Sequence, residues 1–191
     1  MSVTTKFESG RQGARSIAVW DPLVRLIHWS LALVILLNST IIDEESKLHE
    51  WAGYVALGLV GIRLIWGFVG SRNAKLSAFP PNPVAAIRYL RTLSNGDKTI
   101  HLSHNPLGAL MVYNIWGTVL VLGATGYMMC TVQFFGIEWV EEAHEAAYIW
   151  LLVSIFLHVA GVTLDSWRSG VSLIGAMIDG RKRFPEDRRV E

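Results

Sequence analysis

Four long runs of apolar residues, separated by polar segments, divide the chain. They cover residues 23–42, 51–69, 107–130 and 146–164, and they hold almost no charged side chains. Each run approaches the roughly 20 apolar residues that a helix needs to cross a bilayer. The pattern therefore predicts four membrane-spanning helices.

The composition agrees with this pattern. Of the 191 residues, 51% are hydrophobic and 17% are charged, whereas soluble domains usually carry about 25% charged residues. The alternative is a soluble helical domain whose core helices are buried. Four such runs leave too little polar surface to keep that domain in water. We therefore expect an all-α integral membrane protein built as a four-helix bundle.

The basic residues indicate how the bundle is oriented. Apart from Lys47 and Arg63, every Lys and Arg lies at or before the start of the first run (Arg25 being the last of these), in the central loop, or after the fourth run. The two other connections, around residues 43–45 and 138–142, are short and acidic. The positive-inside rule then predicts that both termini and the central loop are cytoplasmic. Positions next to the membrane explain the basic tails better as lipid headgroup contacts than as a nucleic-acid site.

The chain contains one predicted membrane domain, residues 19–183, between a cytoplasmic tail, 1–18, and a disordered tail, 184–191. A Pro-rich stretch in the central loop stops any helix and opens a short one over residues 84–93. Its apolar and basic positions alternate as in a helix that lies on the membrane surface. A second interfacial helix is predicted over residues 171–178, with a basic end at residues 179–183.

Four histidines lie within or at the ends of the predicted spans: His28, His49, His144 and His158. Ionisable residues inside a membrane are costly and usually functional, although any single one could instead bond to a neighbouring helix. At about 1.5 Å per residue, His28 and His158 lie roughly 22–25 Å from the outer surface. His49 and His144 both lie close to that surface. The histidines therefore form two pairs at two depths.

Two pairs at two depths suit two haem b groups, each ligated by one histidine from either side. His144 and His158 are 14 residues apart, about 3.9 helical turns, so both project from nearly the same face. Zinc would need three or four ligands at one point. A proton-coupled transporter or an assembly subunit is the non-redox alternative, but the span interiors lack the carboxylates that proton transporters usually carry.

Other residues are expected to support the haems. Gly53 and Gly161 lie on the faces of nearby histidines, where a missing side chain makes room for a porphyrin. Arg25 is expected to pair with a haem propionate or to reach the headgroups. For Arg63 the expected partner is a propionate of the inner haem, and a helix C-terminal carbonyl is the alternative. Two histidines before the third span are predicted to be solvated loop residues, with a role near the inner haem or a quinone as the alternative: His101 and His104.

Several short motifs occur between residues 19 and 183: Trp20-Asp21-Pro22 with Arg25, His28 and Trp29; His49-Glu50-Trp51 with Gly53 and Tyr54; Arg63 with Trp66-Gly67; His104-Asn105-Pro106-Leu107-Gly108; Thr125-Gly126; His144 with His158; and Gly180-Arg181-Lys182-Arg183. Together they resemble the prokaryotic cytochrome b561 family, which includes the b-type cytochrome subunits of nickel–iron hydrogenases. The resemblance implies the ligand pairs His28 with His158 and His49 with His144, as the depths do.

The resemblance also implies a role: electron exchange between the membrane quinone pool and a protein partner in the bacterial inner membrane. The partner would be a c-type cytochrome or a hydrogenase-like enzyme, so the chain is either an electron carrier or a subunit of a quinone-linked oxidoreductase. Assembly as a homodimer is one arrangement that the sequence leaves open. Some relatives oxidise superoxide and reduce quinone. The acidic outer connections would attract that anion weakly, so this alternative ranks lower.

Overall fold

The computed structural model describes residues 15–94 and 101–184. The predictions for residues 1–14 and for a disordered tail beyond Phe184 lie outside these ranges. The described elements follow one another as β1 (Arg15–Ala18), α1 (Pro22–Thr40), α2 (Lys47–Val69), a 3-10 turn (Leu76–Ala78), α3 (Pro83–Ser94), α4 (Pro106–Met129), α5 (Glu138–Ser169), α6 (Leu173–Asp179) and β2 (Arg181–Phe184).

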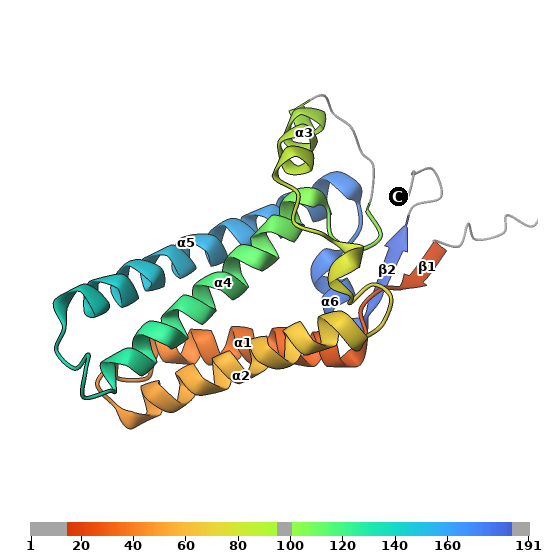
Figure 1. Ribbon diagram of the computed structural model, residues 1–191. Helices are drawn as coiled ribbons and strands as arrows, with labels where there is room; N and C mark the ends of the chain where they lie inside the picture. Colours follow the sequence, from red (N-terminus) through yellow and green to blue (C-terminus); the bar gives the residue numbers. More distant parts are fainter. Residues whose placement is uncertain (1–14, 95–100, 185–191) are drawn as a thin grey trace, which may run out of the picture.

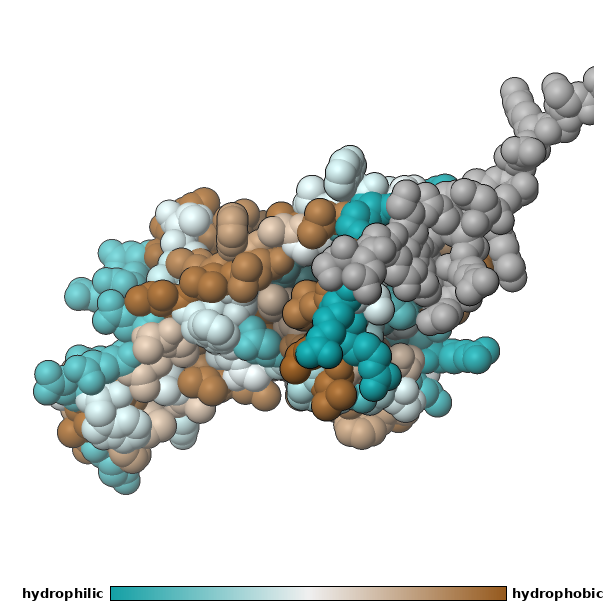
Figure 2. All heavy atoms as spheres, turned by 90° about the horizontal axis from the view of Figure 1, so that it is seen from above, coloured by the Kyte–Doolittle hydropathy of each residue, from teal (hydrophilic) through white to brown (hydrophobic). Residues whose placement is uncertain are grey.

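Four long helices form the body of the molecule (Figure 1). The helices α1, α2, α4 and α5 are long and apolar enough to cross a membrane, which confirms the predicted all-α membrane bundle. Helix α1 packs against α2, α2 against α4, and α4 against α5. Figure 2 shows apolar surface along the length of the bundle and hydrophilic surface gathered toward its ends. The bundle therefore presents an apolar belt of the kind a bilayer covers.

Local caps explain where the first and third spans begin. The side chain of Asp21 accepts a hydrogen bond from the backbone N–H of Val24 at 2.9 Å, and Asn105 accepts one from Gly108 at 2.7 Å. Each cap is followed by a proline at the first helical position, where a missing N–H costs nothing. These starts lie one residue before the apolar runs at residues 23 and 107.

Helix α5 is longer than the predicted span of residues 146–164. It has 32 residues, which is roughly 48 Å at 1.5 Å per residue, against about 30 Å of hydrocarbon. Its first turn carries Glu138 and Glu141. Because charged residues are excluded from an apolar run but not from a helix, the apolar run marked only the membrane part of α5.

The two ends of the bundle differ. Helices α1, α4 and α6 begin, and α2 and α5 end, at the end that also carries β1, β2 and α3; we call this the tail end (Figure 1). The opposite end, where residues 41–46 and 130–137 connect the helices, is the loop end. At the tail end β1 and β2 pair as a two-stranded antiparallel sheet. The basic residues 181–183 therefore belong to the strand β2 and do not form the predicted end of an interfacial helix. The predicted helix is present as α6, which ends at Asp179.

Helix α3 stands out sideways from the tail end, across the direction of the long helices (Figure 1). Its bounds, Pro83–Ser94, lie within one residue of the predicted 84–93. Three of its apolar side chains are exposed: Val84, Ile87 and Leu90. A helix across the bundle axis with an exposed apolar side suits a position in the membrane interface.

Candidate functional site

Four imidazole rings meet in two pairs inside the bundle. His28 of α1 faces His158 of α5 with 6.4 Å between ring centres, and His49 of α2 faces His144 of α5, also at 6.4 Å. The first pair lies toward the tail end and the second toward the loop end. These are the two pairings expected from the depths. Ligation of iron by them stays a prediction.

The spacing of each pair fits one metal ion between two imidazoles. Bonds of about 2.0–2.1 Å from metal to nitrogen, plus about 1.1 Å from each nitrogen to its ring centre, give roughly 6.3 Å. Among the described residues no group of three or more His, Cys, Asp or Glu side chains could hold a metal ion. Two protein ligands per site suit a haem, because the porphyrin supplies the other four nitrogens.

The backbone of α5 stands away from α1 and α2. Within residues 15–94 and 101–184, α5 packs closely against α4 and α6, and it makes few or no close backbone contacts with α1 or α2. Helices in direct contact lie about 8–10 Å apart. The four histidines therefore reach across a wider separation, as expected for helices that hold a macrocycle between them.

Polar atoms around these rings are buried without partners. The Nδ1 atoms of His28 and His49 are buried, and neither has a hydrogen-bond partner in the described part of the chain. Such atoms usually cost about 1–3 kcal/mol each, so they tend to mark functional positions. His144 differs, because its Nδ1 lies 2.8 Å from the hydroxyl of Thr125.

Arg63, near the end of α2, is buried, with 5% of its surface exposed. One nitrogen of its guanidinium donates to the carbonyl of Ala74 at 3.0 Å, and the other terminal nitrogen, NH1, has no partner among the described residues. The group also lies over the rings of Trp116 and Phe79, at 5.1 and 5.9 Å from their centres. The carbonyl of Ala74 lies in the loop after α2 and is not a helix C-terminal carbonyl. A propionate contact of NH1 stays a prediction.

Arg25 connects two helices. Its NH1 donates to the carbonyl of Ile178 at 2.5 Å, at the end of α6, and its Nε is buried without a partner in the described ranges. Trp29, one turn further along α1, donates to the carbonyl of Met177 at 3.1 Å. Arg25 therefore holds α6 against α1, and a propionate contact for it stays a prediction.

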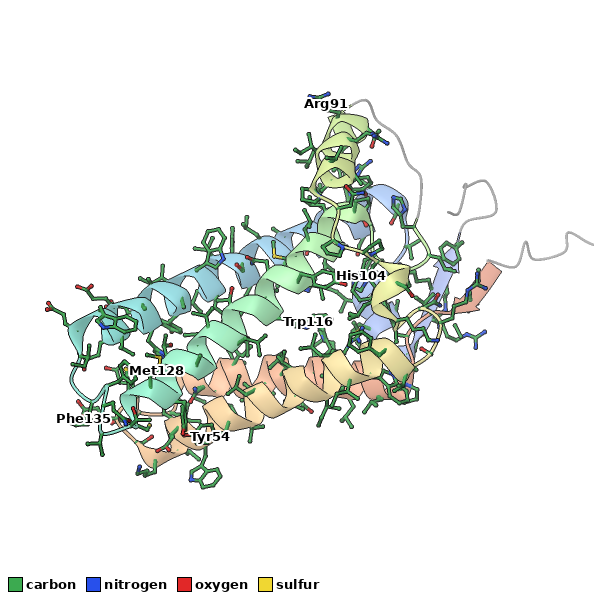
Figure 3. All side chains as sticks on the ribbon, in the orientation of Figure 1. Tyr54, Arg91, His104, Trp116, Met128 and Phe135 are labelled. Atoms are coloured by element: carbon green, nitrogen blue, oxygen red, sulfur yellow. The ribbon has the colours of Figure 1, made fainter. Side chains whose placement is uncertain are left out.

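The prediction that His104 is a solvated loop histidine was wrong. Its ring packs between Trp20 and Phe79, with ring centres 4.9 and 4.6 Å away, and its Nδ1 is buried without a described partner. Burial lowers the pKa of His104 to about 3, and the cations of Lys182 and Arg63 act in the same direction. Figure 3 shows His104 at the tail end, just before α4, and Trp116 on the side of α4 toward α1 and α2.

Lys182 closes this end of the bundle. It is 4% exposed, and its Nζ donates to the carbonyls of His101 at 3.0 Å and Ser103 at 2.8 Å. Burial lowers the pKa of Lys182 to about 8. The strand β2 thus ties the end of the described chain to the loop before α4. Sequence patterns missed this contact because the lysine lies within a basic run that looked solvated.

The glycines expected near the haems border open space: a Cβ on Gly53 or on Gly161 would meet no atom within 4 Å. Their role in haem packing stays a prediction. A separate groove of about 480 Å³ lies between α4 and α5. None of the predicted site residues lines it. Its lining is Tyr113, Asn114, Gly117, Thr118, Val121, Ala146, Ala147 and Trp150.

Comparison with known proteins agrees with this geometry. The family model of prokaryotic cytochrome b561 matches residues 19–180. The chain belongs to this family. With its four apolar helices, it is a multi-pass membrane cytochrome of the b type, with haem b as its cofactor and electron transfer as its role.

Two curated relatives extend the comparison. The chain is 24% identical to a protein of Azotobacter vinelandii and 25% identical to one of Azotobacter chroococcum mcd 1. Each alignment covers 91% of this chain and 91% of the relative. Both relatives carry the name "Probable Ni/Fe-hydrogenase B-type cytochrome subunit". No solved structure matches the chain significantly.

Proposed function

We propose that this cytochrome binds two haems, ligated by His28 with His158 and by His49 with His144, and passes electrons between the membrane quinone pool and a protein redox partner. The observation that carries the proposal is the pair of 6.4 Å ring spacings at two levels of one bundle. Each spacing is close to the roughly 6.3 Å expected for two imidazoles on one iron. The separation of α5 from α1 and α2 supports it independently.

A haem bound at each level supplies reversible exchange of one electron between its ferric and ferrous states. The protein fixes both levels through α5, which contributes one histidine to each pair. His144 and His158 are 14 residues apart, so the levels are roughly 21 Å apart along the axis. The four helices keep water from the rings, and the two sites lead electrons from one side of the membrane toward the other.

The residues around Arg63 would hold the carboxylate groups of the tail-end haem. NH1 of Arg63 and Nδ1 of His104 are both buried without described partners, and the electrostatic interactions of His104 reach both His28 and His158. A propionate between them would satisfy these two atoms. It would also supply a counter-charge for a cation buried at membrane depth, where an unpaired charge is costly.

The tail end would face the cytoplasm. Basic side chains gather there, on α3, at the end of α5 and on β2, whereas the loop end carries Asp43, Glu44, Glu45, Glu138, Glu141 and Glu142 with Lys47 as the basic residue among the described ones. The positive-inside rule then places both termini inside a bacterial cell. Helix α3 would lie in the inner leaflet and contact lipid directly.

We infer a hydrogenase-like enzyme as the protein partner, ahead of a c-type cytochrome. Two relatives named as hydrogenase cytochrome subunits align over 91% of their own length. A subunit that serves such an enzyme would receive its electrons and deliver them to quinone. The alternative partner would use the same two haems with a different docking surface.

The test is a haem count combined with oxidation by quinone. The full chain is purified in detergent, its haem is quantified as the pyridine complex, and decylubiquinone is mixed without oxygen with the protein reduced by dithionite and freed of the excess. We expect two haems b per chain and a b-type reduced spectrum that disappears on mixing. A chain without haem would contradict the whole proposal, whereas two haems that quinone leaves reduced would contradict the quinone role.

A further inference from the structure

Thr125 of α4 contacts the ring of His144 on α5. Its hydroxyl oxygen lies 2.8 Å from Nδ1 of His144. The same oxygen lies 2.9 Å from the carbonyl of Val121 and 3.2 Å from that of Leu122. Thr125 is buried, with 7% of its surface exposed. Because the hydroxyl is buried, the two carbonyls and the imidazole nitrogen are its hydrogen-bond partners.

The number of protons on the Thr125 hydroxyl determines which group is the donor in each of these hydrogen bonds. A threonine hydroxyl carries one proton and two acceptor lone pairs, and a backbone carbonyl only accepts. The hydroxyl proton therefore goes to the carbonyl one turn back, and a lone pair faces the histidine. His144 must then donate from Nδ1, which leaves its Nε2 unprotonated.

Gly126 permits the close approach of this ring. A Cβ at Gly126 would lie 3.4 Å from Cε1 of His144, which is about van der Waals contact. The ring of His144 therefore lies against α4 at the position of this glycine. The adjacent threonine and glycine thus position the ring together, one by a hydrogen bond and one by its lack of a side chain.

The contact distinguishes His144 from His28 and His49. At the tail end, Nδ1 of His28 is buried without a described partner, and so is Nδ1 of His49 at the loop end. His144 is therefore a histidine whose orientation is fixed through a side chain of another helix. A hydrogen bond from a ligating imidazole makes it a stronger electron donor to the metal and stabilises the oxidised form.

We propose that Thr125 is a positioning residue for the loop-end haem, whose hydroxyl fixes the tautomer and orientation of His144 and lowers the reduction potential of that haem. This rests on the proposed ligation of two haems. Removing the hydroxyl is expected to shift the ferrous-to-ferric ratio of the loop-end haem at least threefold toward ferrous at a given potential. That corresponds to about 28 mV, at 59 mV per tenfold for one electron.

The test uses Thr125→Val, which keeps the shape, and Thr125→Ser, which keeps the hydroxyl. Each is made in two backgrounds: His158→Ala, which retains the loop-end haem, and His49→Ala, which retains the tail-end haem. Redox titrations of the purified proteins are followed in the visible spectrum. We expect Thr125→Val to raise the potential in the first background alone, and Thr125→Ser to restore it.

Loss of haem is also informative. If Thr125→Val loses the loop-end haem while Thr125→Ser retains it, the hydroxyl is needed to present His144, as proposed. Unchanged potentials in Thr125→Val, equal shifts in Val and Ser, or haem loss in both would overturn the inference. Absence of haem from the unmodified chain would instead contradict the proposed function, so the two failures are distinguishable.

Discussion

Replacement of Arg63 by glutamine should weaken the binding of the tail-end haem and leave the binding of the loop-end haem unchanged. NH1 of Arg63 is buried without a partner among the described residues, and a buried donor that stays unsatisfied costs about 1–3 kcal/mol. Its removal therefore offsets part of the loss of the 3.0 Å bond to Ala74 and of the contact with Trp116. The haem-free protein should lose little stability.

The haem-loaded protein should respond differently. A charge-assisted hydrogen bond from Arg63 to a propionate would contribute about 1.5–3 kcal/mol. At about 1.4 kcal/mol per tenfold, Arg63→Gln should weaken binding of the tail-end haem roughly 10- to 150-fold. The loop-end haem should be held as before, because its histidines lie roughly 21 Å away along the axis.

Transfer of haem to an excess of apomyoglobin measures the release rates of both haems in one experiment, and weaker binding is expected as faster release. Two release phases of equal amplitude are expected, of which Arg63→Gln accelerates one. Arg88→Gln is the matched control, because Arg88 is an exposed cation of α3 at the same end. Equal acceleration of both phases, or release as slow as in the unmodified protein, would refute a propionate contact of Arg63.

Two further substitutions test the packing of the bundle. Asp21→Ala should lower the free energy of unfolding by about 1–3 kcal/mol, because Asp21 caps α1 and accepts from Trp66 at 3.0 Å. Burial raises the pKa of Asp21, but hydrogen bonds from Ser71 and Trp66 outweigh this effect and hold the pKa below its ordinary value. The loss of unfolding free energy in Asp21→Ala should therefore be full above about pH 4 and should shrink as the pH falls below it, because the carboxylate of the unmodified protein is then protonated. Gly123→Leu should cost about 1–3 kcal/mol, because a Cβ there would overlap a leucine of α2, whereas Gly117→Leu, which meets no atom within 4 Å at Cβ, should cost less. Thermal unfolding in detergent measures each, and no loss in Asp21→Ala, or equal losses in the two glycine variants, would contradict these contacts.

The sequence was sufficient to predict the spans and the histidine pairs. A transmembrane helix is determined by about 20 consecutive residues, and its start by the cap that precedes it, as at Asp21 and Asn105. The fixed rise of a helix then converts residue number into depth. His28 and His158 could be paired in this way although 130 positions separate them.

The tail-end structure could not be predicted, because it depends on contacts between distant segments. The strands β1 and β2 have four residues each, too few for a pattern, and they pair across almost the whole chain. The burial of His104 requires Trp20 and Phe79, which belong to two other segments. Nothing in their local sequence indicates that the three meet.

The contact of Thr125 with His144 was also beyond sequence patterns. A threonine inside a helix usually bonds to the carbonyl one turn back, and Thr125 does so. Its second contact depends on the rotation of α4 against α5. The sequence showed Thr125-Gly126 only as part of a family resemblance, without a physical reason.

The central claim is that each histidine pair holds one haem, and the most direct test is a reduced-minus-oxidised spectrum with haem quantitation for His49→Ala and His158→Ala. His101→Ala is the control, since His101 lies outside both pairs. We expect two haems b per chain in the unmodified protein and in the control, and one in each pair variant, with different remaining spectra. Two haems in either pair variant, or no haem in the unmodified chain, would contradict the account.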